Sequence, residues 1–326
     1  MTLVLKHGEI AGLLTADEVR EAVLGGFVEQ SEGEVQLPPR TTIDSRSGRG
    51  WLRLMPVIMN KSGIMGFKAM HSTPRVGVRY FVALYDLDSG ELLVEMDADW
   101  LTSQRTAATA AVGVDILAAR DATEAGVLGS SEQARAMLAA ISRVRRLSRV
   151  KVYSPTPENR RRFAETMSAT LGFEVVAVDT PQQALADVEV VLSIFRAGTA
   201  PLVAADWISP GAHICAASSI RPEARELQDD VWRKCAVVAV DDKAHVLESG
   251  DGRRAIVSGN VSEDRFVEIW EILNRSKPGR ESPEDITLFK AVGTAVQDLA
   301  LGAAIYRRAK EQGLGHDIGS FPRVRL

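Results

Sequence analysis

The sequence predicts an α/β fold in two parts, a doubly wound parallel sheet and a separate α+β unit. The chain has 326 residues, which suits two domains of roughly 100 to 200 residues each better than one core. From residue 124 onward, short apolar runs alternate with helical patterns, which is typical of a parallel sheet wrapped by helices. Before residue 124, longer apolar runs separated by turn residues predict a sheet with helices beside it.

The first part of the chain is expected to begin with a helix and to continue as a sheet. Thr15 and Glu18 form a capping box, and the apolar residues that follow recur at helical spacing, which predicts a helix over 15–30. Strands are expected in four apolar runs, at 51–59, 63–71, 79–86 and 91–97. The alanine-rich run LTSQRTAATAAVGVDILAAR predicts a long helix that closes this unit.

The second part repeats the order strand, turn and helix. Six short apolar runs are expected to be strands: AGVL, RVKVY, FEVVAV, VEVVLSIF, AHICAAS and CAVVAV. Thr156-Pro157 and Thr180-Pro181 each predict the start of a helix. After the polar connection NRSKPGRESPED, the run ITLFKAVGTAVQDLALGAAIYRRAK is expected to form one long final helix.

The composition favours a protein that binds small molecules. No stretch approaches the roughly 20 apolar residues that span a bilayer, so no membrane association is expected. The net charge of −4 gives no global attraction for nucleic acid. The N-terminus lacks a signal-peptide pattern, which predicts residence in the cytoplasm. Cys215 and Cys235 lie in apolar runs and are expected to be buried thiols, and no histidine has a second ligand at metal spacing, so no metal site is expected.

The run VLGSSEQA, residues 127–134, nearly matches the dinucleotide-binding turn G-x-G-x-x-A of a Rossmann domain. Gly129 stands at a strand-to-helix junction, where free N–H groups and the helix dipole can receive a pyrophosphate. Ser131 replaces the second glycine, and its hydroxyl can itself donate a hydrogen bond to the anion. We expect cofactor contacts from this turn, at Gly129, Ser130, Ser131, Glu132 and Gln133. The alternative is an ordinary βα turn without a ligand.

The end of the next expected strand favours NADP, with NAD possible. An acidic residue there would bind a free ribose 2′-hydroxyl, but the strand ends in Tyr153-Ser154-Pro155-Thr156. Ser154, Thr156 and Arg160 can instead meet a 2′-phosphate, within a window (143–162) that holds eight Lys or Arg and one Glu. The alternative is that these arginines form a solvated helix face.

Several runs in fixed order resemble the ornithine cyclodeaminase/mu-crystallin family over nearly the whole chain. They are LPPRTTID, WLRLMPVIM, GFKAM, LTSQRTAATAAVG, VLGSSEQA, RPEARELQDD and ITLFKAVGTAVQDLA. The resemblance implies a homodimer with a substrate-binding and dimerisation domain at 1–118 with 297–326, and a Rossmann domain at 119–296. It also implies chemistry on amino or imino acids with NAD(P).

The resemblance implies that Arg40, Lys68 and Arg105 bind the substrate carboxylate, and that Thr106 lies near the cofactor phosphates. The chemistry agrees, because an imino acid needs fixed cationic donors and an arginine fork can hold both carboxylate oxygens. Lys68 stands in an apolar strand, where desolvation can bring its pKa toward proton transfer, so Lys68 and Arg105 are the expected catalytic residues. For any one cation, a surface salt bridge is the alternative. The remaining expected contacts are Met55 with the substrate, and Ser193 and Ile194 with the cofactor.

The sequence departs from the family at one catalytic position. The cyclodeaminases of the family place an aspartate shortly before a Pro-x-x-x-Glu-Leu block, and here that place is taken by Ile220. Since a hydrocarbon cannot bind an ammonium group, ornithine cyclodeamination is disfavoured. A one-residue shift would bring in Ser219, which we expect to contact the substrate. For Asp298 in the last helix, a capping role and an interdomain salt bridge explain the sequence equally well.

The sequence therefore predicts an NAD(P)H-dependent oxidoreductase that reduces a small, cyclic or linear, 2-imino acid. The three cations are expected to face the dinucleotide across a cleft shared by the two domains, with water excluded. An alanine-type dehydrogenase, which runs the same geometry backward, is the nearest alternative. A ligand-binding protein without turnover and a cyclodeaminase-type lyase are the others.

Overall fold

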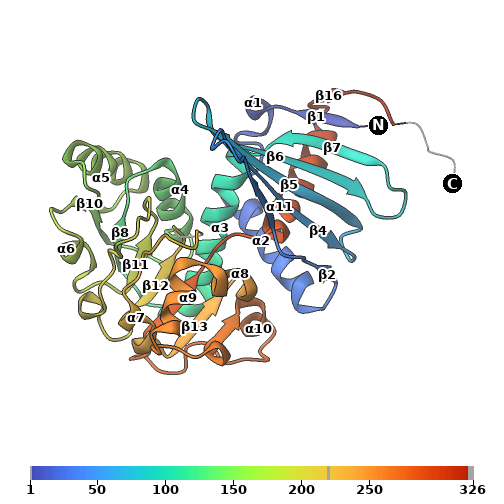
Figure 1. Cartoon of the computed structure of the whole chain (residues 1–326). Helices are drawn as coiled ribbons and strands as arrows, with labels where there is room; N and C mark the ends of the chain where they lie inside the picture. Colours follow the sequence, from blue (N-terminus) through green and yellow to red (C-terminus); the bar gives the residue numbers. More distant parts are fainter. Residues whose placement is uncertain (1, 219–220, 322–326) are drawn as a thin grey trace. The chain divides into compact units, whose positions relative to one another are not determined.

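The structure, a computed structural model, describes residues 2–218 and 221–321. It divides into two compact units, Met1–Arg105 with Thr294–Leu326 (unit 1) and Thr106–Gly293 (unit 2). This division falls inside helix α3 (Asp99–Leu117), whereas the sequence predicted boundaries at 118 and 296. The predicted α/β class is confirmed, since one unit contains a parallel sheet with helices and the other a mainly antiparallel sheet with helices (Figure 1).

Unit 1 is built on a sheet with the order β16-β1-β7-β6-β5-β4-β2, in which β3 also pairs with β4. The strands are β1 (Leu3–Leu5), β2 (Val35–Gln36), β3 (Thr41–Asp44), β4 (Trp51–Met59), β5 (Ile64–Thr73), β6 (Gly77–Asp86), β7 (Leu92–Asp97) and β16 (His316–Asp317). The four strands expected from apolar runs are β4 to β7. The short strands β1, β2, β3 and β16 carry too few apolar residues for periodicity to reveal them.

Helix α11 (Ala295–Glu311) covers one face of the sheet of unit 1, and α2 (Ala16–Ser31) packs on α11. The unit also contains α1 (His7–Ile10) and the first part of α3. The predicted capping box at the start of α2 is confirmed: Thr15 N–H donates to Glu18 Oε2 at 2.8 Å, and Glu18 N–H donates to Thr15 Oγ1 at 3.3 Å. Helix α11 packs on α2 and on β4, β5 and β6, where Gly26 permits a close approach to Val296.

The other face of this sheet carries exposed apolar side chains. Along β4, Met55, Val57 and Met59 are buried, while the alternate residues Leu52, Leu54 and Ile58 are exposed to 40, 37 and 36 %. Because successive side chains of a strand point to opposite faces, one side of β4 belongs to the core and the other lies at the surface.

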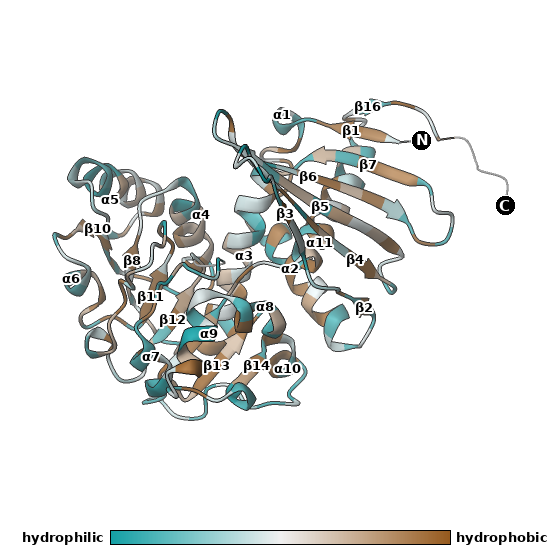
Figure 2. Ribbon diagram, viewed as in Figure 1, coloured by the Kyte–Doolittle hydropathy of each residue, from teal (hydrophilic) through white to brown (hydrophobic). Residues whose placement is uncertain are grey.

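Unit 2 contains a parallel sheet with the order β10-β9-β8-β11-β12-β15-β13-β14. The strands are β8 (Glu124–Leu128), β9 (Arg149–Tyr153), β10 (Glu174–Ala177), β11 (Val190–Ser193), β12 (His213–Ala216), β13 (Val237–Val240), β14 (Phe266–Glu268) and β15 (Thr287–Lys290). The six expected strands are β8 to β13. Every residue of β11, β12, β13 and β15 is buried, as expected for strands covered on both faces. Hydrophobic residues predominate in the strands labelled β11 and β13 (Figure 2).

The helices of unit 2 follow its strands. They are α4 (Glu132–Ile141), α5 (Pro157–Leu171), α6 (Pro181–Leu185), α7 (Asp229–Lys234), α8 (Lys243–Glu248), α9 (Gly250–Val257) and α10 (Ile269–Leu273), with the 3-10 turns η1 (Ala205–Trp207) and η2 (Glu263–Arg265). Strand order reverses at β8, because β9 and β10 lie on one side of it and β11 and β12 on the other. In such sheets, ligands bind beyond the carboxyl ends of the strands at this switch point.

One predicted element is wrong. The run ITLFKAVGTAVQDLALGAAIYRRAK is not one helix, because Thr287–Lys290 forms β15 and α11 begins only at Ala295. Gly293, with φ of +76°, separates the two elements. The run TLFK is buried between β12 and β13, and this tertiary pairing outweighs the local helical pattern. Within the described parts of the chain, the helices all fall short of the length and apolarity that a membrane crossing requires.

Candidate functional site

Three charged residues of unit 1 meet in its interior and form the buried cation cluster (Lys68, Arg105 and Asp298). Lys68 lies on β5, Arg105 on α3 and Asp298 in the first turn of α11. Lys68 Nζ donates to Asp298 Oδ1 at 2.9 Å, and Arg105 Nε donates to the same oxygen at 3.0 Å. The side chains of Lys68 and Asp298 are fully buried, and that of Arg105 is 10 % exposed. One carboxylate oxygen therefore holds both cations.

Neighbouring side chains fix this cluster further. Arg105 Nη1 donates to Gln297 Oε1 at 3.1 Å. Lys68 Nζ lies 4.9 Å from the centroid of the Tyr80 ring, within the range of a cation–π contact. Met55 is buried and pairs in register with Lys68 across β4 and β5, so both side chains lie on the same face of the sheet.

The pKa of Lys68 lies far below its ordinary value. Burial lowers this pKa to about 7, which the charge of Asp298 opposes and the charges of Arg105 and Arg40 reinforce. A lysine with a pKa near neutrality can exchange a proton during a reaction at physiological pH. While Lys68 is protonated, two cations are paired with one carboxylate, so the cluster carries an excess positive charge in a buried position, which favours binding of an anion.

The structure settles the two roles that the sequence left open for Asp298. Lys68, Arg105 and Asp298 all belong to unit 1, so the ion pairs of Asp298 are not interdomain. Its carboxylate accepts hydrogen bonds from Lys68 and Arg105 and does not cap the helix. Asp298 Oδ2 is buried and accepts no hydrogen bond from any residue in the described part of the chain. Tyr80, Gln297 and this role of Asp298 were not found from the sequence, because none of them lies near Lys68 along the chain.

In unit 2, the turn after β8 has the geometry of a dinucleotide-binding turn at its first position. Gly129 has φ of +124°, and a Cβ there would lie 2.0 Å from the carbonyl oxygen of Ile194. Ser131 is the N-cap of α4, with φ of −70° and ψ of 171°, and its Oγ accepts a hydrogen bond from Ala134 N–H at 3.2 Å. Because φ at Ser131 is negative, the backbone does not require the second glycine of the motif.

We predict that these two positions respond very differently to substitution. Gly129→Ala is expected to lower the free energy of unfolding by about 2 kcal/mol or more, since its Cβ would overlap a carbonyl group. Ser131→Gly, the matched control, is expected to lose only a few tenths of a kcal/mol, because glycine is itself a tolerated N-cap. Urea unfolding of both variants measures the difference. Equal stability of Gly129→Ala and the wild type would contradict the prediction.

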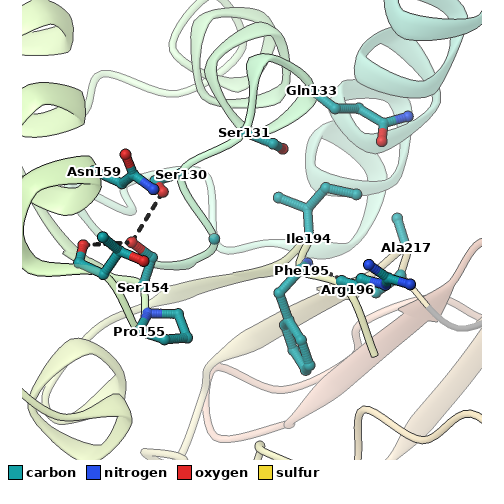
Figure 3. A pocket seen from close by; sticks show the side chains of 13 residues that line it. Ser130, Ser131, Gln133, Ser154, Pro155, Asn159, Ile194, Phe195, Arg196 and Ala217 are labelled. Atoms are coloured by element: carbon teal, nitrogen blue, oxygen red, sulfur yellow. Dashed lines mark hydrogen bonds between the residues drawn. The ribbon is translucent and has the colours of Figure 1, made fainter. Parts of the chain in front are cut away.

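A pocket of about 410 Å³ lies at the carboxyl ends of β8, β9, β11 and β12, and we call it the strand-end pocket (Figure 3). It is lined by Gly129, Ser130, Ser131, Gln133, Ser154, Pro155, Thr156, Asn159, Ile194, Phe195, Arg196, Ala217 and Ser218. Seven of the expected cofactor residues are among them: Gly129, Ser130, Ser131, Gln133, Ser154, Thr156 and Ile194. The rule that ligands bind at strand ends would also have indicated Phe195 and Ser218.

Four expected cofactor residues do not line the strand-end pocket as described: Thr106, Glu132, Arg160 and Ser193. Glu132 is the first residue of α4 and is exposed. Ser193 is fully buried, and its hydroxyl donates to Glu226 Oε2 at 2.6 Å. The expected substrate residue Ser219, and Ile220 beside it, lie outside the described residues.

Two arginines of α5, Arg160 and Arg161, are already engaged. Arg160 pairs with Asp179 and donates to the Ser154 carbonyl at 3.1 Å, and its guanidinium lies 5.8 Å from the centroid of the Tyr153 ring. Arg161 is bonded to Glu158 one turn away and is 62 % exposed, so it fits a solvated helix face. At the end of β9, Ser130 Oγ donates to Ser154 Oγ at 2.9 Å (Figure 3).

Histidine and cysteine residues give no sign of a metal site. No group of three potential ligands is found among residues 2–218 and 221–321. His213 is buried, its Nδ1 is 2.9 Å from Thr287 Oγ1, and burial lowers its pKa to about 3. Cys215 and Cys235 are free and buried, and burial raises both of their pKa values.

Comparison with proteins of known sequence gives relatives that extend over most of the chain. An alanine dehydrogenase of Archaeoglobus fulgidus is 30 % identical over 98 % of this chain and 99 % of its own. A Delta(1)-pyrroline-2-carboxylate reductase of Bacillus cereus is 29 % identical over 97 % of this chain and 99 % of its own. The ketimine reductase mu-crystallin of Mus musculus is 30 % identical over 88 % of this chain and 89 % of its own.

Solved structures agree with these relatives. The Delta(1)-pyrroline-2-carboxylate reductase of Thermococcus litoralis, solved with NADH and L-proline, has a TM-score of 0.92 and 31 % identity over 97 % of this chain and 100 % of its own. An archaeal alanine dehydrogenase dimer with bound NAD has a TM-score of 0.90 and 28 % identity over 98 % of this chain and 99 % of its own. The iminosuccinate reductase of Paracoccus denitrificans, solved with NAD+, has a TM-score of 0.91 and 26 % identity over 97 % of this chain and 98 % of its own.

The resemblance noted in the sequence motifs is confirmed by a family model that matches residues 1–313. Its match covers both units, including the β5 and α3 residues of the buried cation cluster and the turn at Gly129. The chain therefore belongs to the ornithine cyclodeaminase/mu-crystallin family.

Proposed function

We propose that this protein is an NAD(P)H-dependent oxidoreductase that reduces a small 2-imino acid to the amino acid. The observation that carries the proposal is the buried cation cluster, in which Lys68 and Arg105 share one oxygen of Asp298 and leave an excess positive charge. A carboxylate is the anion that such a cluster suits. The relatives named for pyrroline-2-carboxylate, ketimine and iminosuccinate reduction support the C=N bond as the group that reacts.

In the proposed mechanism, Arg105 and Arg40 bind and orient the carboxylate of the imino acid. Arginine is suited to this task because its planar fork can contact both oxygens and thereby fix the face of the C=N bond. The reduction also needs a hydride at the imine carbon, which a bound nicotinamide cofactor would supply. Lys68 gives a proton to the nitrogen, so that the C=N bond becomes a CH–NH bond. The lysine is left neutral, a form that its burial favours, and it regains a proton from solvent.

The strand-end pocket is the proposed cofactor site. Gly129 allows the turn to approach Ile194 closely, and α4 begins at the pocket, where Ser131 and Gln133 belong to the lining. The first turn of a helix suits an anion, because its N–H groups lack partners within the helix and the helix dipole is positive there. The Ser131 hydroxyl accepts a bond from Ala134 and retains its own hydrogen, which it can donate to a phosphate oxygen. Together these groups fit a pyrophosphate.

For the cofactor, we propose a preference for NADPH, with NADH also accepted. Support comes from the end of β9, where Ser154, Thr156 and Asn159 line the pocket, and from the absence of a carboxylate among the residues described as its lining. The solved neighbours hold NAD or NADH, so both cofactors have to be compared directly. Arg160 would have to exchange its bond to Asp179 for one to a 2′-phosphate.

We predict that Ser154→Asp reverses this preference. A carboxylate at the end of β9 would repel a 2′-phosphate and accept hydrogen bonds from a free ribose, so the ratio of kcat/KM for NADPH to that for NADH is expected to fall by about tenfold or more. The matched control is Ser148→Asp, which places a carboxylate just before the opposite end of the same strand. A ratio that changes equally in both variants, or in neither, would contradict the assignment.

A second candidate function is an alanine-type dehydrogenase, favoured by the Archaeoglobus relative. The same residues would serve, since oxidation of an amino acid is the reverse of the proposed reaction. Purified protein should be mixed with NADPH or NADH and a panel of cyclic and linear 2-imino acids, and the loss of reduced cofactor followed. Consumption with cyclic imino acids supports the reductase, and consumption only with pyruvate and ammonium supports the dehydrogenase. Cofactor binding without consumption would favour a ligand-binding protein, and turnover without net consumption a lyase.

We also propose a cytoplasmic homodimer. Support comes from the exposed apolar side chains Leu52, Leu54 and Ile58 on the open face of β4, and from the dimeric alanine dehydrogenase neighbour. We predict that Leu54→Glu shifts the protein from dimer to monomer in sedimentation equilibrium, because it places a charge in an apolar interface. A wild-type monomer, or a dimer that survives Leu54→Glu unchanged, would contradict this surface.

A further inference from the structure

A buried carboxylate of unit 2 connects the ends of three neighbouring strands. Glu226 is fully buried. Its Oε2 accepts the hydroxyl of Ser193, the last residue of β11, at 2.6 Å, and its Oε1 accepts the N–H of Ser218, just beyond β12, at 3.0 Å. Oε1 also accepts a bond from Lys290, the last residue of β15. Since β11, β12 and β15 are adjacent in the sheet, one side chain ties three carboxyl ends together.

These contacts lead directly to the wall of the strand-end pocket. Ser218 Oγ accepts the N–H of Phe195 at 2.8 Å, which joins the segment after β12 to the segment after β11. Ile194, Phe195 and Ser218 all line the pocket, whereas Glu226 does not. Glu226 therefore fixes pocket residues through their backbone and through Ser218, without lining the pocket itself.

The charges in this network are costly to bury. Lys290 is fully buried, pairs with Glu226 and lies 3.4 Å from Asp251 Oδ2. Asp251 in turn accepts the backbone N–H groups of Glu226 and Leu227, and burial raises its pKa. Buried ion pairs often add little to stability compared with apolar residues of the same volume. What they do provide is a set of directional bonds, which here hold two loops in one arrangement.

We propose that Glu226 is a positioning residue of the cofactor site: it holds the segments after β11 and β12 in the arrangement that receives the nicotinamide half of the dinucleotide. The inference rests on the proposed function, because it takes the strand-end pocket as the cofactor site. Glu226 does not touch the reacting atoms. It acts through Ser218, Phe195 and Ser193.

The test is Glu226→Gln, in which an amide replaces one of the two acceptor oxygens and faces a donor. We expect the Kd for NADPH and NADH, measured by fluorescence titration of the folded full-length protein, to rise about tenfold, because a buried donor is left unsatisfied at the pocket wall. The KM for the imino acid at saturating cofactor should stay near the wild-type value, since the cation cluster lies in unit 1. A purely structural role would lower the Tm without changing the cofactor Kd.

Asp241→Asn is the matched control. Asp241 is also a fully buried carboxylate of unit 2, but it bonds the N–H groups of Val292 and Gly293, which do not line the pocket. This variant is expected to lower the Tm and leave the cofactor Kd unchanged. If Glu226→Gln behaves in the same way, the proposal is overturned.

Two further outcomes are distinguishable. Should Glu226→Gln fail to fold, Ser193→Ala decides, since it removes one donor to Glu226 without touching the pocket lining. A raised cofactor Kd in Ser193→Ala then supports the proposal, and an unchanged Kd overturns it. If the wild-type protein binds neither NADPH nor NADH, the proposed function itself fails, and the positioning role that depends on it fails with it.

Discussion

Replacement of Arg105 by alanine is expected to lower kcat/KM for imino-acid reduction by about 100- to 1,000-fold. The Arg105 side chain is 10 % exposed and is held by Asp298 and Gln297, so its guanidinium is fixed in position and is the more exposed of the two cations in the cluster. Removing it takes away a charged hydrogen-bond donor from a desolvated site, which typically costs about 2 to 5 kcal/mol. Steady-state kinetics with a cyclic imino acid measure the loss, and the cofactor Kd should remain near the wild-type value.

Two variants separate the role of Arg105 from a general loss of positive charge. Arg105→Lys keeps the charge but lacks the fork, so only part of the activity is expected to return. Arg307→Ala removes an exposed arginine from α11, the helix that carries Asp298, and should leave the kinetics unchanged. Wild-type kinetics in Arg105→Ala would remove this residue from the substrate site and, with it, the basis of the proposed function.

Asp298→Asn is expected to move the alkaline limb of the pH–rate profile to lower pH. Lys68 has to be protonated to act as the acid, so activity is present below its pKa of about 7 and is lost as the pH rises through it. The charge of Asp298 raises this pKa, while burial, Arg105 and Arg40 lower it. Without the Asp298 carboxylate, only burial and the two arginines act on Lys68, and its pKa falls further below 7. Less of the lysine is then protonated at pH 7, so kcat at that pH should fall by about tenfold or more.

The groups around Lys68 make this shift a specific readout. Asp298 faces it from α11, Arg105 from α3, and Tyr80 from β6, where burial raises the tyrosine pKa and so keeps that side chain neutral near pH 7. The matched control is Glu311→Gln, which neutralises an exposed carboxylate of the same helix and should leave the limb in place. A limb that does not move in Asp298→Asn would exclude Lys68 as the proton donor.

The buried cation cluster and the Glu226 network use charge in the same way. In each, a fully buried lysine is paired with a fully buried carboxylate. A third charged group is paired with one of the two, Arg105 with Asp298 in the first and Asp251 with Lys290 in the second. Such arrangements are poor sources of stability, because the desolvation of each ion offsets most of the attraction. Their value to an enzyme is geometric, since charged hydrogen bonds fix the positions of groups that bind ligands. In this family member, one cluster lies in each unit.

The sequence predicted the local features of this protein well. The alternation of strand and helix in unit 2 followed from short apolar runs with turn residues between them, and β8 to β13 are where these runs lie. Gly129 was recognisable because a strand-to-helix turn that brings two backbones together excludes a side chain. Lys68 and Arg105 were found from residue type and motif. Whether each of these residues has its expected catalytic role stays a prediction.

Other features depended on which segments the fold brings together. Asp298 lies 230 positions from Lys68 in the chain, and Lys290 lies 64 positions from Glu226, so no local pattern could pair them. Ser193 was expected to contact the cofactor, but its hydroxyl donates to Glu226, which lies 33 positions further along the chain and which no local pattern could have paired with it. The run TLFK forms a strand because it pairs with β12 on one side and with β13 on the other. Residue spacing determined the elements and the types of chemistry available, because periodicity and turn propensity act over a few residues. The tertiary structure alone decided which charges share an oxygen, because contacts between distant segments depend on the topology of the two sheets.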